Sequence, residues 1–198
     1  MNSYIPLLLF CFSISITPGP NNIMIMMSGA KFGLLKSLPH YLGIGIGFNI
    51  MVFCIGLGLG EVFNNFPILH EMIKYLGAAY MLYLAFSLIR SNNEISKTNN
   101  RSRPLTFFQA ALFQWINPKV WIMIIGVVST YSKANVNPLY QSFVMSLMFL
   151  VAGFPCVAAW FIFGVKISKY LSNKLRMKIF NLTMGMLLVV SIILMLLK

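Results

Sequence analysis

The sequence predicts an all-α integral membrane protein in which six transmembrane helices form two inverted three-helix repeats. Hydrophobic residues make up 59% and charged residues only 9% of its 198 positions, whereas soluble domains carry roughly 25% charged residues. The uncharged stretches are each close to the ~20 residues that cross a bilayer. Two of these stretches, about a hundred residues apart, also contain proline-rich interruptions at matching positions, so we expect helices 1 and 4 to be broken.

The uncharged stretches define the elements in order. We expect spans at about 4–27, 38–60, 67–89, 105–131, 140–165 and 179–197. They leave no room for a soluble domain, so the prediction is a single membrane domain over 1–198. It divides into a first repeat at 1–90, a polar cytoplasmic linker at 91–106 and a second repeat at 107–198. The first span lacks the basic start and cleavage site of a secretory signal, so we interpret it as retained.

The basic residues predict the orientation of the spans. The opposite loops and the termini hold only Lys74, Lys133 and Lys198, together with the acidic Glu61 and Glu71. The loops that share one side hold Lys31, Lys36, Arg90, Lys97, Arg101, Arg103, Lys166, Lys169, Lys174, Arg176 and Lys178. The positive-inside rule then puts these basic loops in the cytoplasm and both termini in the periplasm. Topology alone explains the net charge of +12, without nucleic acid as a partner, although basic loops that bind acidic lipids remain an alternative.

Each half has three spans, an odd number, so the second half enters the membrane from the side where the first half ends. If the two halves are related, they are therefore inverted repeats. Ile16 and Pro18 fall on Ile116 and Pro118 at an offset of 100. A slightly larger offset puts Gly47-Phe48 on Gly153-Phe154 and Gly58 on Gly164. The order of these matches favours an internal repeat.

The first interruption is the box Thr17-Pro18-Gly19-Pro20-Asn21-Asn22. Proline removes a backbone donor, and open backbone inside a membrane is tolerated only beside protein or water. We expect a half-helix to begin near Asn21 and Asn22 and to present its N–H groups and positive dipole end to an anion. The alternative is a packed kink in which the asparagines only satisfy the freed backbone groups.

The second interruption is Asn117-Pro118-Lys119, which lies near the middle of its span. A lysine there is too deep to reach the interface and costs roughly 2.5 to 3.5 kcal/mol. We therefore expect Lys119 to face a water-lined cavity and to attract a substrate carboxylate, with Asn117 as a hydrogen-bonding partner. The alternative is that a distorted helix lets the ammonium escape to a loop. Broken helices at matching positions are typical of a transporter's central binding site.

Small residues in the second span predict close helix packing rather than a ligand site. Gly43 and Gly47 are the central members of this group, and small side chains let helix backbones approach each other in a membrane. The three cysteines all fall inside predicted spans and match no metal-ligand spacing, so we expect no metal or cofactor.

The acidic residues limit the function classes. There is no aspartate, and Glu61, Glu71 and Glu94 lie in loops or at span edges, so no proton carrier can be named. The same scarcity argues against an intramembrane enzyme, which needs a nucleophile with a base or paired acids. A heavy-metal exporter stays as an alternative, disfavoured because Lys119 has the wrong charge for a cation site. A membrane structural protein is another alternative, and solute uptake rather than efflux stays open, because sequence alone does not fix the direction of transport.

These motifs resemble those of the lysine exporter and homoserine/threonine resistance (LysE/RhtB) family of bacterial amino-acid exporters. The similarity covers the Thr17-to-Asn22 box, the glycine-rich end of the second span, Asn117-Pro118-Lys119 and the overall length. The resemblance implies export of amino acids or close derivatives across the bacterial inner membrane, driven by the proton motive force. It implies neutral substrates such as homoserine, threonine or cysteine-pathway metabolites, and leaves a homo-oligomer open. Its motif residues here are Pro18, Gly19, Pro20, Asn21, Asn22, Asn117, Pro118 and Lys119.

Overall fold

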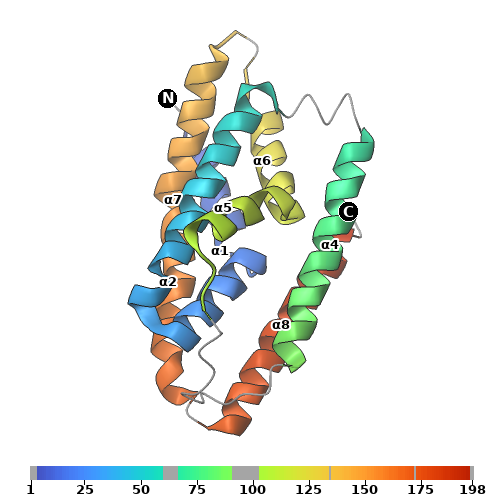
Figure 1. Ribbon diagram of the computed structural model, residues 1–198. Coiled ribbons are helices and arrows are strands. Elements are labelled where there is room, and N and C mark those ends of the chain that lie inside the picture. Colours follow the sequence, from blue (N-terminus) through green and yellow to red (C-terminus); the bar gives the residue numbers. More distant parts are fainter. Residues whose placement is uncertain (1–3, 60–66, 91–102, 134, 172, 197–198) are drawn as a thin grey trace.

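The computed structural model describes residues 4–59, 67–90, 103–133, 135–171 and 173–196. Helices and short connections make up these ranges, with no strand among them, as expected for an all-α membrane protein. Their order is α1 (Tyr4–Ile16), α2 (Pro20–Cys54), the π-helix η1 (Ile55–Leu59), α4 (Pro67–Arg90), α5 (Phe107–Ile116), α6 (Pro118–Tyr131), α7 (Pro138–Ile167), the 3₁₀ turn η2 (Ser168–Tyr170) and α8 (Lys174–Leu196) (Figure 1).

Residues 91–102 of the predicted linker lie outside the described residues, and so do Glu61, Glu94, Lys97 and Arg101. The division of the chain into repeats and linker therefore stays a prediction.

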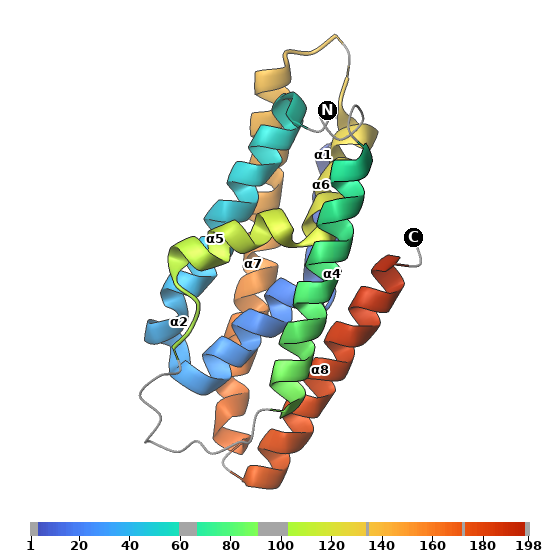
Figure 2. The ribbon, with the colours of Figure 1, turned by 45° about the vertical axis from the view of Figure 1, so that its right-hand side comes forward.

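The helix α2 contains a sharp turn at Gly33, in the loop expected between the first two spans. Gly33 has φ 76° and ψ −178°, a backbone conformation that favours glycine. Figure 2 shows the chain reversing there, between the blue first part of α2 and its cyan second part. The first expected span thus corresponds to α1 with the start of α2, and the second to the rest of α2 with η1.

The number of membrane-length helices differs from the six spans expected. By length and apolar composition, three described segments could cross a membrane: Pro20–Leu59, Pro138–Tyr170 and Lys174–Ile193. The helices α5 and α6, bent by 67° at their junction, would make a fourth. The difference has local causes, because the first segment includes the Gly33 turn and α1 has only 13 residues. The helix α4 has 24 residues but is not among these segments.

The helices form two groups that the first part of α2 joins. In Figures 1 and 2, α2 and α7 run side by side, while α4 and α8 form a separate pair. Buried residues of the first part of α2, including Ile23 and Met26, pack with Met81 of α4 and Leu188 of α8. A second buried cluster joins α1, α6, α7 and the far end of α2. The start of α2 therefore lies between the two groups and contacts both of them.

Glycines bring α2 close to α5. A methyl group at Gly43 would clash with the Phe107 carbonyl, and one at Gly47 would lie 2.5 Å from Ala111 Cα. A corresponding approach occurs on α7, where a methyl group at Gly153 would lie 2.9 Å from Ser15 Oγ of α1. Small residues thus sit where these helices pass each other.

Candidate functional site

The first helix break separates α1 from α2 at Thr17, Pro18 and Gly19. Gly19 is the N-cap of α2 in an extended conformation, and Pro20 is its first helical residue. The carbonyl end of α1 is satisfied by side chains. Asn22 Nδ2 donates to the Ser15 carbonyl at 2.8 Å and to the Thr17 carbonyl at 2.9 Å. Trp160 Nε1, from α7, donates to the Ile16 carbonyl at 3.0 Å.

Lys119 reaches this first break from the second one. Its Nζ donates to the Thr17 carbonyl at 3.2 Å, to Thr17 Oγ1 at 2.9 Å and to the Pro18 carbonyl at 3.1 Å. The ammonium therefore lies at the carbonyl end of α1, where a cation is favoured. Its stem lies against Gly19, because a methyl group there would be 2.8 Å from Lys119 Cδ. Sequence reasoning expected Lys119 in a cavity but missed this interaction with α1.

The second helix break consists of Asn117 alone, which ends α5 and caps α6. Its Oδ1 accepts from the Lys119 backbone N–H at 3.2 Å, and its own N–H donates to the Gln114 carbonyl at 3.3 Å. Pro118 follows as the first residue of α6. Trp121 Nε1 also donates to the Trp115 carbonyl at 2.8 Å. The polar groups at this break are thus paired with residues close by in the sequence.

A pair of amide side chains joins the two breaks. Asn21 Nδ2 donates to Gln114 Oε1 at 2.7 Å, and Gln114 Nε2 donates to Asn21 Oδ1 at 3.2 Å. Gln114 is 0% exposed and also donates to the Ala110 carbonyl. Gln114 was not predicted as a site residue. Its signal in the sequence is a glutamine in an apolar stretch, three residues before Asn117.

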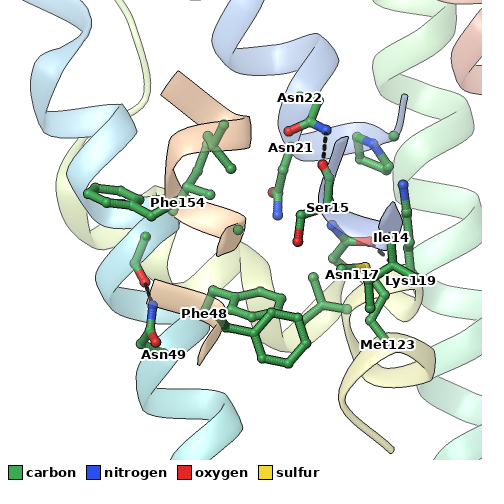
Figure 3. A pocket seen from close by; sticks show the side chains of 18 residues that line it. Ile14, Ser15, Asn21, Asn22, Phe48, Asn49, Asn117, Lys119, Met123 and Phe154 are labelled. Carbon is green, nitrogen blue, oxygen red and sulfur yellow. Dashed lines mark hydrogen bonds between the residues drawn. The ribbon is translucent and has the colours of Figure 1, made fainter. Parts of the chain in front are cut away.

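The two breaks border one pocket, which also touches α2 and α7 (Figure 3). The pocket has an empty volume of about 520 Å³, part of it open to the surroundings. The predicted site residues that line it are Gly19, Pro20, Asn21, Asn22, Asn117 and Lys119. Thr17, Pro18 and Pro118 adjoin these residues in the chain but do not line it.

Several lining residues were missed by sequence reasoning. Ser15 comes from α1, Phe48 and Asn49 come from α2, and Phe149 and Phe154 come from α7. Nothing marks Ser15, Asn49 or Phe149 in an apolar span, whereas Phe48 and Phe154 belong to the repeated Gly-Phe pair. One end of the pocket is polar, formed by amides, a hydroxyl and an ammonium, and the remainder is aliphatic and aromatic apart from Asn49.

Lys119 is the only charged side chain among the described residues that line the pocket. Within the described part of the chain, no group of three or more His, Cys, Asp or Glu side chains could hold a metal ion. The pocket therefore offers one positive charge and neutral polar groups. This arrangement suits an anionic group such as a carboxylate better than a cation.

Comparisons with known proteins identify the family of the chain. The family model of LysE type translocators matches residues 12–197. The chain is 27% identical to the cysteine/O-acetylserine efflux proteins of Salmonella choleraesuis (strain SC-B67) and Salmonella typhimurium (strain LT2), over 70% of each chain. It is 28% identical to the uncharacterized membrane protein YrhP of Bacillus subtilis (strain 168), over 94% of this chain and 93% of the relative. No solved structure matches.

The family match confirms the resemblance found in the sequence and the prediction of a membrane transporter that takes a small-molecule substrate. Translocators and efflux proteins move solutes and are not enzymes, which agrees with the prediction that this chain is not an enzyme. Because the family model covers nearly the whole sequence, the chain belongs to the LysE type translocator family.

Proposed function

We propose that this translocator exports amino acids or close derivatives across the bacterial inner membrane. Its substrates in this proposal are neutral, such as homoserine, threonine or metabolites of the cysteine pathway. The observation that carries the proposal is the pocket at which the two helix breaks meet (Figure 3). Discontinuous helices with their ends at a central pocket are a common way for transporters to bind solutes. The Salmonella relatives, named for efflux of cysteine and O-acetylserine, support the substrate class.

The carboxylate of the substrate binds at the polar end of the pocket. Lys119 lines it with an ammonium, and α2 begins beside it at Pro20. A helix start stabilises a negative charge through its N–H groups and its dipole. The three acceptors of the ammonium are neutral oxygens, and a carboxylate is a stronger acceptor. Substrate binding therefore exchanges one of these bonds for a charged one.

The rest of the proposed substrate-binding set shapes this end of the pocket. Thr17 and Pro18 hold the ammonium, while Gly19 leaves space for its stem. Asn21, Asn22 and Asn117 keep the two helix breaks in place, and Pro118 starts α6 behind them. The two breaks are linked, since Lys119 bonds to Thr17 and Pro18 and Asn21 bonds to Gln114.

The charge of the pocket favours neutral over basic amino acids. A lysine or arginine substrate would bring a second positive charge into a space whose only described charged side chain is Lys119. Like charges in a low-dielectric site repel strongly. The amino group of a neutral substrate instead meets the Ser15 hydroxyl and aromatic faces such as Phe48, which attract cations weakly.

We also propose the architecture expected from the sequence, six spans in two inverted three-helix repeats. Support comes from glycines at matching positions. Gly47 of α2 lies against Ala111 of α5, the first part of the second broken helix. Gly153 of α7 lies against Ser15 of α1, the first part of the first broken helix. Each repeat thus packs its second span on the broken helix of the other, as an inverted pair requires.

The same architecture puts the basic loops in the cytoplasm and both chain ends in the periplasm. Tags fused to each end should therefore be accessible to impermeant reagents in intact spheroplasts. A carboxy-terminal tag that is accessible only after the membrane is permeabilised would contradict the six-span arrangement.

A heavy-metal exporter is the alternative, and the pocket argues against it. Transition metals take thiolate, imidazole or carboxylate ligands, and the described pocket lining has none of these. A structural role without transport does not agree with membership of a translocator family.

Efflux from membrane vesicles tests the proposed function. Vesicles that contain the protein are loaded with a panel of labelled amino acids and with divalent metal ions, and release is followed with and without a proton gradient. We expect release of neutral amino acids that depends on the gradient. Release of metal ions alone, or of no amino acid above the rate of empty vesicles, would contradict it.

A further inference from the structure

Two aromatic contacts between α2 and α7 lie at the pocket. Tyr41 of α2 stacks on Phe154 of α7, with ring centroids 4.3 Å apart and an interplanar angle of 12°. Phe48 of α2 meets Phe149 of α7 edge to face, with centroids 4.9 Å apart. Phe48, Phe149 and Phe154 all line the pocket. Figure 3 shows Phe48 and Phe154 at separate places around it, with Ser15 and Asn21 on the facing side.

The two contacts lie at different depths along the helices. Tyr41 and Phe48 are seven residues apart on α2, or about 10 Å at 1.5 Å per residue. Ile44 and Gly45, which come between them, line the pocket. Tyr41 and Phe154 lie toward the Gly33 turn and the last turn of α7, which contains Lys166. Phe48 and Phe149 lie toward η1 and the start of α7. The pocket therefore has one ring contact toward each end of the molecule.

The sequence repeat relates one member of each contact to the other. The dipeptide Gly47-Phe48 matches Gly153-Phe154. Its glycines, Gly47 and Gly153, are the residues at which the second span of each repeat packs on the broken helix of the other. If the repeats are inverted, Phe48 on one side of the membrane has the same surroundings as Phe154 has on the other side. Phe48 and Phe154 are thus equivalent positions that face opposite ends of the pathway.

We propose that these contacts are the two gates of the translocator. Tyr41 and Phe154 close the pocket toward the basic loops, while Phe48 and Phe149 close it toward the chain ends. This inference rests on the proposed transport through this pocket. Alternating access then requires that one ring contact opens while the other stays closed, which exchanges the environments of Phe48 and Phe154.

The details of the contacts describe both gates in their closed state. Phe154 lies over Gly45, where any side chain would clash with its ring, and it is half-buried. The Tyr41 hydroxyl donates to the Phe154 carbonyl at 3.3 Å, which fixes the tyrosine to α7 when the rings are stacked. Phe161 extends the stack, 5.6 Å from Tyr41. Phe149, on the other side, is 1% exposed within the cluster that joins α1, α6 and α7.

Thiol accessibility of the pocket tests the gates. The native Cys11, Cys54 and Cys156 are replaced by alanine, and Ser15→Cys introduces a thiol into the pocket lining. A membrane-impermeant methanethiosulfonate reagent is then added to sealed vesicles of each orientation. Phe154→Ala should raise the labelling rate about tenfold from the side of the basic loops, and Phe48→Ala about tenfold from the opposite side. A tenfold change corresponds to about 1.4 kcal/mol.

Phe163→Ala is the matched control, because Phe163 also lies on α7 but is 51% exposed on its outer surface. If the Ser15→Cys protein does not fold, Met123→Cys places the thiol elsewhere in the same pocket. The proposal is wrong if both variants raise labelling from the same side, or if neither exceeds the control. Labelling requires no substrate, so the labelling test and the export assay can fail separately. A failed export assay contradicts the proposed function, whereas the labelling rates test the gates alone.

Discussion

The two helix breaks occupy matching positions in the sequence but are stabilised in different ways. At the first break, the carbonyl groups from Ser15 to Pro18 are satisfied by Asn22, by Trp160 from α7 and by Lys119 from α6. At the second break, Asn117 caps α6 with its own side chain and bonds to Gln114 nearby. The first break thus depends on distant helices, whereas the second is maintained locally.

This difference indicates separate roles for the breaks. A break with a local cap keeps that cap when neighbouring helices move, so the 67° bend can serve as a support for Lys119. A break whose partners come from other helices changes when those helices move. We therefore expect the first break to change its conformation when substrate binds. We expect the second break to hold the backbone of Lys119 in place.

The largest expected effect is at Gly19. The change Gly19→Leu puts a side chain where the Lys119 stem lies, with its first carbon 2.7 Å from Nζ. Lys119 must then leave the end of α1, and transport should be abolished although the protein still inserts. Efflux from vesicles measures transport, and membrane fractionation measures insertion.

The matched control is Gly126→Leu in α6, where a methyl group would meet nothing within 4 Å. This variant should transport normally. Normal efflux by Gly19→Leu would show that the first break is only a kink and has no part in binding.

The next effect is on substrate affinity at Lys119. The change Lys119→Met keeps the length of the stem but removes the ammonium, so binding of a neutral amino acid should weaken about 10- to 100-fold, from the roughly 1.5 to 3 kcal/mol of a charged hydrogen bond. Lys119→Arg should restore part of the affinity, because a planar group does not replace a compact one. Binding to the purified protein measures both. Unchanged affinity together with lower stability would mean that Lys119 serves only to cap α1.

Stability should separate the two breaks directly. The change Asn22→Ala removes its hydrogen bonds to the Ser15 and Thr17 carbonyls, of which the Thr17 carbonyl keeps the bond from Lys119, and should lower the free energy of unfolding by about 2 kcal/mol. The change Asn117→Ala removes one helix cap and should cost about 1 kcal/mol. Denaturant unfolding in detergent compares them. A larger loss for Asn117→Ala would reverse the roles assigned to the two breaks.

The smallest effect concerns the link between the breaks. Hydrogen bonds between membrane helices average about 0.6 kcal/mol, so the two bonds of Asn21 and Gln114 should give a coupling free energy of about 1 kcal/mol. A double-mutant cycle with Asn21→Ala and Gln114→Ala measures it by unfolding. Additive losses would mean that the breaks lie side by side without energetic coupling.

The sequence predicted the features that follow from backbone chemistry. Proline and glycine interrupt helices by their own geometry, so the breaks near Pro18 and Pro118 could be located without a structure. Glycines that pack between helices, such as Gly47, also follow from side-chain size. The turn at Gly33 lies in the loop expected between the first two spans.

Features that depend on contacts between distant residues could not be predicted. Lys119 bonds to Thr17 across 102 positions, and Gln114 bonds to Asn21 across 93. No local pattern encodes such a pair, because each partner looks like an isolated polar residue in an apolar stretch. The pocket phenylalanines were missed for the same reason, since an aromatic residue in a membrane span usually faces lipid or the core.

Protection of a pocket thiol by substrate tests the central claim, that the two breaks form the amino-acid site. A thiol at Ser15→Cys, in the cysteine-free protein, should be labelled more slowly when the exported neutral amino acid is present, and lysine should have no effect. A thiol at Val144→Cys, in a separate pocket lined by Tyr4, Tyr131 and Lys133, should be unaffected by either. Protection at Val144→Cys alone, or none at Ser15→Cys while efflux continues, would place the substrate elsewhere and contradict this account.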